Sequence, residues 1–413
     1  MGQTEGRGDG RFWAVFNRNT TLLILGGALV SVPIGLVFVS IPVYLQRLLF
    51  GPTTIGLVLA VAGVTAVALM IPVGLVADRF GRRRIMALGG IAAALSFFVL
   101  GLTDSIFGLL AFAVLFGASE AFYFATWNAL LADASSKETR TLIFGVSFTA
   151  SAVGMAAGTL IGSVADQAVL SGLTPQSAYQ PLFLLLGTLM LVVPAIVPLL
   201  RLPHREKPTV RGLLPPESRR IITRFLAANI LIGAGAGMIV PLFSWWFLQQ
   251  FGVGETFSGP LFAISSMVAA GAYLVAPSIA RRVGLIRSVV TLQVAATVIL
   301  FLIPLAAALG AFALLVVSVL YVVRNSLMNM TWPVLTSFLM GAVDPNARSA
   351  ASAVTSVSFR LPFALSTSLG GYLFSLDLAT PFYVTGILYA FGTAAFWAFF
   401  RSYEMPEADS TGR

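Results

Sequence analysis

The chain has 413 residues, of which 58% are hydrophobic and only 10% are charged, and its mean hydropathy is +0.92. About a quarter of the residues of a soluble globular protein are charged, so this composition excludes a soluble globular domain and indicates a protein that crosses a membrane several times. The absence of cysteine excludes disulfides, thiolate metal sites and cysteine nucleophiles.

The formal net charge of +9 carries information about orientation. Almost every Lys and Arg falls in every second connection between apolar runs, and the opposite connections contain only Arg47. Basic residues are enriched in cytoplasmic connections, so this alternation predicts two cytoplasmic termini and an even number of spans in the cell membrane. The positive charge is therefore interpreted as an orientation signal with some attraction to the lipid bilayer, and no nucleic-acid partner is expected.

The apolar runs predict twelve transmembrane helices, because each run is about the 20 residues that a helix needs to cross a bilayer. In chain order they cover 20–46, 53–77, 85–103, 106–132, 141–166, 180–200, 221–250, 256–280, 287–308, 311–341, 348–375 and 379–401. We expect an all-α integral membrane protein with a cytoplasmic tail (1–19), a six-helix bundle (20–200), a cytoplasmic linker (201–220), a second six-helix bundle (221–401) and a second tail (402–413).

An internal repeat supports two similar halves. The sequence Thr126-Trp127-Asn128-Ala129-Leu130 in the fourth predicted helix recurs 205 positions later as Thr331-Trp332-Pro333-Val334-Leu335 in the tenth. Pro72 and Pro277 match at the same offset. We therefore predict that the two bundles are pseudo-symmetric, with a site near the membrane midplane between them.

The stretch from Gly74 to Arg84 lies in the tight connection between the second and third predicted helices. Its pattern, G-x-x-x-D-R-x-G-R-R-R, resembles the signature loop of the major facilitator superfamily of secondary transporters. In that family these residues latch the cytoplasmic ends of the helices together, and Asp133 is a candidate partner for one of the arginines. The resemblance implies a conformational latch made of Gly74, Asp78, Arg79, Gly81, Arg82, Arg83, Arg84 and Asp133.

Three ionisable residues lie near the middle of predicted spans, namely Glu120, Arg324 and Arg360. Such residues are costly in a membrane and usually face a cavity or a partner. Two helix faces related by the repeat extend the candidate substrate and proton-coupling cavity, because their residues follow helical spacing. The complete candidate set is Glu120, Tyr123, Phe124, Trp127, Arg324, Asn325, Asn329, Trp332 and Arg360.

We hypothesise a small organic anion as substrate, because two arginines outnumber one glutamate and a guanidinium matches a carboxylate or phosphate. Glu120 then couples transport to protons or pairs with Arg324. The alternative is that Glu120 and one arginine form a structural ion pair. Multidrug or sugar efflux remains open, although drug:proton antiporters of the family carry an arginine where this chain has Ala113. A non-transporting membrane sensor is a further alternative.

The same residues make an enzyme the least expected class, because the single histidine lies in a polar connection and no second carboxylate accompanies Glu120. We expect no cofactor, no metal and a monomer. Asp166 is predicted to be solvated at the outer end of the fifth helix. Trp245 and Trp246 fit either an external gate or interfacial aromatic anchors.

Overall fold

The computed structural model describes residues 16–135, 139–200, 216–344 and 348–403, and within them the regular structure is helical. The first predicted half contains α2 (Arg18–Arg47), α3 (Pro52–Phe80), α4 (Arg82–Leu102), α5 (Ile106–Ala134), α6 (Arg140–Leu170), α7 (Pro175–Met190), α8 (Val192–Ile196) and η1 (Val197–Leu199). The second contains α9 (Pro216–Ile239), η2 (Val240–Leu242), α10 (Phe243–Phe251), α11 (Glu255–Val283), α12 (Leu285–Ala306), η3 (Gly310–Phe312), α13 (Ala313–Ala342), α14 (Arg348–Leu376), α15 (Thr380–Phe400) and η5 (Arg401–Tyr403).

Within the described residues, 10 helical segments are long and apolar enough to cross a membrane. The other two predicted spans correspond to α11 and α14, which have 29 residues each and are diluted by Ser, Gly and Arg. At 1.5 Å per residue each is roughly 43 Å long, which exceeds the hydrocarbon core of about 30 Å. The all-helical, multi-pass architecture predicted from the sequence is confirmed. The predicted number of twelve spans is reached only if α11 and α14 are counted as spans because of their length.

The chain packs as two compact units. One comprises residues Met1–Gly35, Thr65–Gly158 and Tyr179–Thr209, and the other comprises Leu36–Val64, Thr159–Ala178 and Val210–Arg413. The second unit therefore includes the ends of α2, α3 and α6 that come from the first predicted half. This division follows packing, and the bundle boundaries read from the sequence stay a prediction. Most of the predicted linker and tails lies outside the described residues.

The core of the first unit forms where α2 meets α5 and α8. Leu23 of α2 packs with Trp127 and Leu131 of α5 and with Val193 of α8, and all four side chains are nearly inaccessible to solvent. Small residues allow the helices to approach closely here. A Cβ atom built on Gly154 would lie 2.1 Å from the Ala28 backbone oxygen, so α6 and α2 are in backbone contact at this point.

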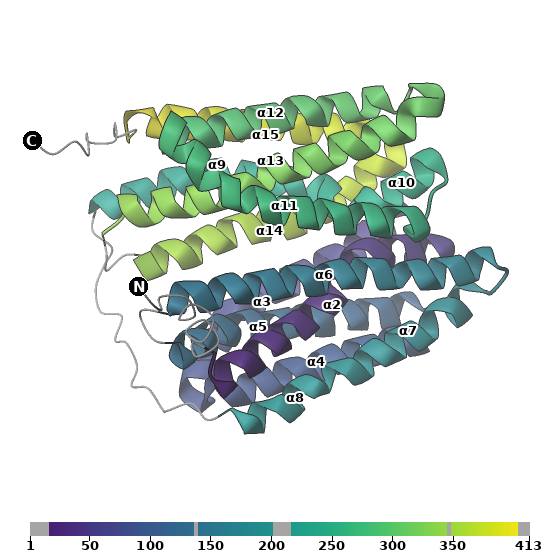
Figure 1. Cartoon of the computed structure of the whole chain (residues 1–413). Coiled ribbons are helices and arrows are strands. Elements are labelled where there is room, and N and C mark those ends of the chain that lie inside the picture. Colours follow the sequence, from purple (N-terminus) through teal and green to yellow (C-terminus); the bar gives the residue numbers. More distant parts are fainter. Residues whose placement is uncertain (1–15, 136–138, 201–215, 345–347, 404–413) are drawn as a thin grey trace, which may run out of the picture. The chain divides into compact units, whose positions relative to one another are not determined.

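The core of the second unit is rich in aromatic rings. Phe225 of α9 contacts Phe396 and Phe400 of α15, and Phe338 of α13 contacts the same two phenylalanines. Figure 1 shows α9, α11, α12, α13 and α15 as long helices that run side by side, and their mutual contacts support this view. The packing of these helices fixes the positions of the α13 side chains that face the interior of the unit.

Candidate functional site

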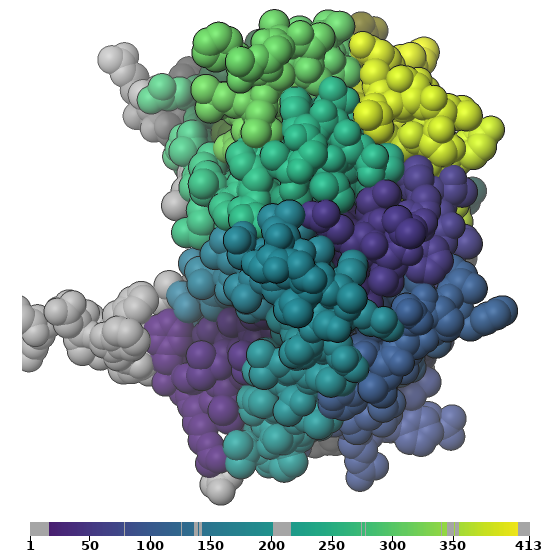
Figure 2. Space-filling model, turned by 90° about the vertical axis from the view of Figure 1, so that its right-hand side faces the viewer, coloured from purple at the N-terminus to yellow at the C-terminus, as the bar shows by residue number. Residues whose placement is uncertain are grey.

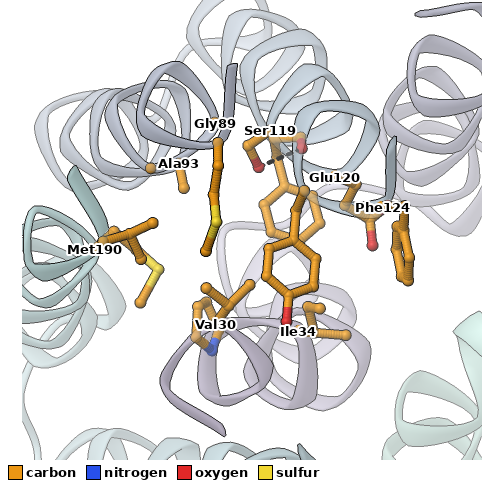
Figure 3. Close-up of a pocket in the computed structure, with 14 residues that line it drawn as sticks. Val30, Ile34, Gly89, Ala93, Ser119, Glu120, Phe124 and Met190 are labelled. Carbon is orange, nitrogen blue, oxygen red and sulfur yellow. Dashed lines mark hydrogen bonds between the residues drawn. The ribbon is translucent and has the colours of Figure 1, made fainter. Parts of the chain in front are cut away.

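Glu120 of α5 lies in the first unit and lines a pocket of about 430 Å³ between α2, α4, α5, α7 and α8. The remaining lining is largely apolar and includes Tyr123 and Phe124. Figure 3 shows Glu120 and Phe124 on one side of this pocket and Met190 on the opposite side. Glu120 is thus a half-buried carboxyl group in a largely apolar pocket within the first unit, and its place in a central cavity and its role in proton coupling stay predictions.

Trp127 packs between α5 and α2 and is not among the residues that line this pocket. Its side chain is 3% exposed, and its indole N–H donates to the backbone oxygen of Leu23 at 3.3 Å. The ring stacks on Tyr123 with centroids 5.4 Å apart. A Cβ atom on Gly27 would lie 2.8 Å from the indole. The sequence placed Trp127 on a cavity-lining face; in the structure the indole finds its polar partner on a neighbouring helix and is packed there.

The repeat-related face on α13 lines a second, more polar pocket in the second unit. The empty space within this pocket, counted together with the open solvent at its mouth, is about 590 Å³. Its polar lining is Asn229, Gln293, Arg324, Asn325, Asn329, Thr331 and Tyr389, and its aromatic lining is Trp332, Phe359 and Phe363. Tyr389, Gln293 and Asn229 were not identified from the sequence, because they are uncharged and lie on helices other than α13, which carries the repeat-related face.

Arg324 is the charged residue of this pocket. It is only 2% exposed, its Nη2 donates to the hydroxyl of Tyr389 at 2.7 Å, and its Cζ lies 5.5 Å from the centre of the Tyr389 ring. Its Nε is buried without a hydrogen-bond partner within the described part of the chain. A buried cation normally needs an ion pair and several acceptors, so Arg324 has unused capacity to bind an anion.

Asn325 and Asn329 form a hydrogen-bonded chain along the wall of the pocket. Asn325 donates to the Ser265 hydroxyl of α11 at 2.8 Å, and Asn329 donates to the Asn325 side-chain oxygen at 3.2 Å. Tyr273 of α11 donates to the Asn329 side-chain oxygen at 2.9 Å. The two amides are thereby held in fixed orientations against α11.

Trp332 and Arg360 occupy different surroundings. Trp332 is 38% exposed and contacts the edge of the Phe359 ring at a centroid distance of 5.0 Å, so it lines the pocket while remaining accessible. Arg360 follows Phe359 on α14, is half-buried, and is not among the residues that line either pocket. The structure therefore brings Arg324, Asn325, Asn329 and Trp332 into one pocket and leaves Arg360 outside it.

The turn between α3 and α4 contains the predicted latch. Gly81 has φ +98°, a conformation that glycine adopts without strain, and it is the N-cap residue that directly precedes α4. Arg82 forms an ion pair with Asp133 at 2.9 Å, and Arg83 donates to the backbone oxygen of Leu200. These contacts join the end of α5 and the end of η1 to the turn.

The other residues of this turn differ in what they contact. Arg79 lies over the Phe80 ring, and the side chains of Arg79 and Arg84 are exposed. Among the described residues, no heavy atom of another helix lies within 4 Å of a Cβ atom built on Gly74. The side chain of Asp78 lies outside the described residues.

Asp166 corrects a prediction. The sequence places it at a helix end, where we expected it to be solvated, but its side chain is 0% exposed. It forms an ion pair with Arg47 of α2 at 3.0 Å and accepts hydrogen bonds from the backbone N–H and the hydroxyl of Thr256 of α11. The prediction was wrong because both partners are distant in sequence and leave no local signal beside Asp166.

Trp245 and Trp246 are also buried, at 3% and 1% exposure, so interfacial anchoring was the wrong interpretation. Trp245 donates to the side-chain oxygen of Gln46 in α2 at 2.7 Å, and Trp246 donates to the backbone oxygen of Leu378 at 3.1 Å. Trp245 thus ties α10 to the end of α2. Burial at an inter-helix contact is what an external gate requires, and that role stays a prediction.

Comparisons with known proteins give consistent findings. A family model described as Major Facilitator Superfamily matches residues 23–367. Multidrug resistance protein 1 of Bacillus subtilis is 24% identical over 390 residues, which cover 92% of this chain and 95% of that protein. A Na(+), Li(+), K(+)/H(+) antiporter of Planococcus maritimus is 26% identical over 155 residues, or 36% of each chain.

Solved structures show the same fold. A mutant of the nucleoside transporter NupG superimposes with a TM-score of 0.73 at 16% identity, covering 93% of this chain and 100% of that chain. A bacterial homolog of the human lysosomal transporter Spinster, inward-facing and unoccupied, gives a TM-score of 0.70 at 15% identity, covering 95% and 100%. At these identities the likeness concerns the fold alone.

Proposed function

The chain belongs to the major facilitator superfamily and is a membrane transporter, and from that premise we propose that it carries a small organic anion by alternating access, coupled to protons. The observation that supports this proposal is Arg324, a buried guanidinium on a polar pocket. Within the described residues its hydrogen bond and its ring contact are both with Tyr389, a neutral side chain. A carboxylate or phosphate of the substrate would supply the missing acceptor for the buried Nε.

The position of Glu120 also favours an anionic substrate. Glu120 lines a pocket of the first unit, and Arg324 lines a pocket of the second. No Asp or Glu is among the residues that line the Arg324 pocket. Arg324 is therefore not neutralised by a carboxylate of its own pocket. We propose that Glu120 serves as the proton-coupling carboxyl, a role in keeping with the similarity to a cation/H⁺ antiporter over part of the chain.

Multidrug efflux is the second candidate, and two observations favour it. The Arg324 pocket is also lined by Trp332, Phe359 and Phe363, which suit flat apolar compounds. A protein called multidrug resistance protein 1 is similar over nearly the whole chain. For either substrate we propose the orientation read from the alternating positive charge, with cytoplasmic termini in the cell membrane.

The two candidates are distinguished by ligand-induced thermal stabilisation of the purified protein. A panel of organic anions, organic cations and sugars is tested against wild type, Arg324→Gln and the matched control Arg287→Gln, an exposed arginine on α12. Because a ligand at 100 times its Kd stabilises the native state by about 2.7 kcal/mol, binding raises Tm measurably. We expect anions to raise the Tm of wild type and Arg287→Gln but not of Arg324→Gln.

Arg360→Gln completes the set and sharpens the assignment. Because Arg360 does not line the pocket, we expect this variant to keep the anion response of wild type. If hydrophobic cations stabilise wild type and Arg324→Gln equally while anions have no effect, the anion proposal is wrong and multidrug efflux takes its place. If Arg360→Gln alone loses the anion response, the anion binds elsewhere than in the Arg324 pocket.

A further inference from the structure

The pocket that Arg324 lines is charged at one end and aromatic at the other. Arg324 and Trp332 both belong to α13, and Trp332 follows by eight residues. At 1.5 Å per residue the two positions are roughly 12 Å apart along the helix. A solute that contacts both side chains therefore needs an anionic group and a second group held at a distance from it.

A layer of aromatic rings lies beyond the charged end of the pocket. Tyr321 precedes Arg324 by about one turn of α13. Its ring stacks on Phe262 of α11 and makes a T-shaped contact with Phe243 of α10, each with centroids 4.8 Å apart. Figure 2 shows the end of the molecule at which α13 begins, where green and yellow atoms of the second unit pack against one another. The anionic group of a solute is therefore expected at this closed end of the pocket, against the guanidinium.

The aromatic end of the pocket is accessible and firmly held. Trp332 is 38% exposed and makes a T-shaped contact with Phe359 of α14 at 5.0 Å, and Phe363 lies about one turn further along α14. A Cβ atom on Gly233 of α9 would lie 2.5 Å from the Phe359 backbone oxygen, and one on Gly237 would overlap the Phe363 backbone oxygen. The two glycines thus let α14 press against α9 and fix the backbone from which both rings project.

The wall between the two ends is largely apolar on α9 and α13. Met328 lies about one turn from each of the two end residues, and Ile232 and Ala236 of α9 also line the pocket. The amides of Asn325 and Asn329 are engaged in hydrogen bonds within the protein. A spacer of methylene groups fits such a wall better than a chain of hydroxyl groups, which would be left without partners.

We propose that this pocket selects amphiphilic aromatic acids, with the carboxylate against Arg324, an apolar spacer along Met328 and a flat ring against Trp332. The inference rests on the proposed function and narrows it from small organic anions to one chemical class. A flat ring on the indole adds aromatic contact energy to the area that it buries, which an aliphatic group does not provide. The competing explanation, in which Trp332 only packs against Phe359, is an outcome of the test.

The proposal is tested by calorimetric titration of the full chain in lipid nanodiscs, with empty nanodiscs as the blank. The probes are hexanoate, which has no ring, phenylhexanoate, which has a ring and a spacer, and cyclohexylhexanoate, whose ring is saturated. Phenylhexanol has the ring and the spacer without the charge. Each is titrated into wild type, Arg324→Gln, Trp332→Leu and Trp397→Leu. The last is the matched control, because Trp397 of α15 is 37% exposed and does not line the pocket.

We expect wild type and Trp397→Leu to bind phenylhexanoate more tightly than hexanoate or cyclohexylhexanoate. Trp332→Leu should weaken phenylhexanoate binding by up to about tenfold and change hexanoate binding much less, because hexanoate has no ring. Arg324→Gln should weaken both acids by about tenfold or more, because a hydrogen bond to a charged group is lost. If Trp332→Leu does not fold, Phe359→Leu serves instead, since it removes the neighbouring ring and should lower the affinity for phenylhexanoate in the same direction.

Equal affinity of wild type and Trp332→Leu for phenylhexanoate would overturn the proposal. So would a wild type that binds phenylhexanoate and cyclohexylhexanoate equally. In both cases, hexanoate binding that depends on Arg324 would leave the anion proposal intact. If phenylhexanol instead binds as tightly as phenylhexanoate, in wild type and in Arg324→Gln alike, the anion proposal is itself wrong. A wild type that binds none of the acids would contradict both proposals.

Discussion

The two repeat-related faces on α5 and α13 have the same residue spacing but different surroundings. Trp127 on α5 is 3% exposed and hydrogen-bonded to α2, whereas Trp332 on α13 is 38% exposed at the edge of a pocket. Glu120 lies in a largely apolar pocket, whereas Asn325 belongs to a chain of polar side chains. The face on α5 is mainly packed around a single acid, and the face on α13 presents polar side chains to a pocket. Equivalent positions in a repeat therefore do not share a role.

The largest expected effect comes from the two tryptophans. Trp127→Ala should destabilise the protein by about 3–5 kcal/mol, because it removes a buried indole and leaves a cavity. Trp332→Ala should cost about 1 kcal/mol or less, because its side chain is partly accessible. The Tm of the two variants in the same detergent measures this difference. Equal losses in Tm would show that the two faces are packed alike and would contradict the difference described above.

A smaller effect is expected at the polar chain. Asn325→Ala should cost about 0.5–1.5 kcal/mol, because the hydrogen bond from Asn325 to the buried Ser265 hydroxyl is lost while Ser265 keeps its hydrogen bond with Tyr321. Ser119→Ala on the first face should cost about 0.5 kcal/mol or less, since the Ser119 hydroxyl donates only to Phe116 of its own helix. Chemical denaturation of the two variants checks the order. A larger loss for Ser119→Ala would contradict it.

The smallest expected effect concerns the side chains that cap the first turns of α7 and α15. These two helices belong to the last predicted span of each half. The backbone N–H of Thr380 donates to the Asp377 carboxylate at 2.8 Å, and this bond, with one from Ala379, lowers the pKa of Asp377. A lowered pKa in the folded state means that the stabilisation is present above the unfolded pKa of about 3.9 and is lost as pH falls through the folded value.

Asp377→Asn should therefore lower Tm slightly at neutral pH, and its difference from wild type should shrink below about pH 4. Thr174, whose hydroxyl accepts from the Ser177 N–H in the first turn of α7, provides the matched control. Thr174→Ala should lower Tm by an amount that does not depend on pH, because a hydroxyl does not titrate in this range. The prediction fails if the Asp377→Asn difference is also constant from neutral to acidic pH.

The fold could be predicted from the sequence because a membrane helix must form its backbone hydrogen bonds within itself and present apolar side chains to lipid. Each span is therefore visible in the sequence as an apolar run of nearly fixed length. Even α11 and α14, with their weaker apolar signal, were predicted from their apolar runs, 256–280 and 348–375, and the alternation of basic connections required only that the number of spans be even. The turn at Gly81 was also accessible, since a run of arginines between two spans must lie at one membrane face.

The partners of the site residues could not be predicted in the same way. Asp166 and Arg47 are 119 residues apart, and their contact depends on how α2 and α6 cross. The repeat identified Trp127 and Trp332 as equivalent positions. The burial of each indole, however, depends on the neighbouring helix, and Gly27 of α2 lies against Trp127.

The hydrogen-bonded asparagines of α13 have a consequence for selectivity. Asn329 donates to the backbone and side-chain oxygens of Asn325, and Asn325 donates one hydrogen bond to Ser265, so most of these amide donors are engaged before any solute arrives. A sugar, which is recognised through many directed hydrogen bonds, would find few free donors on this wall. If the proposed anion binds in the Arg324 pocket, we expect discrimination there to depend on the sign of the solute's charge more than on the number of its hydroxyl groups.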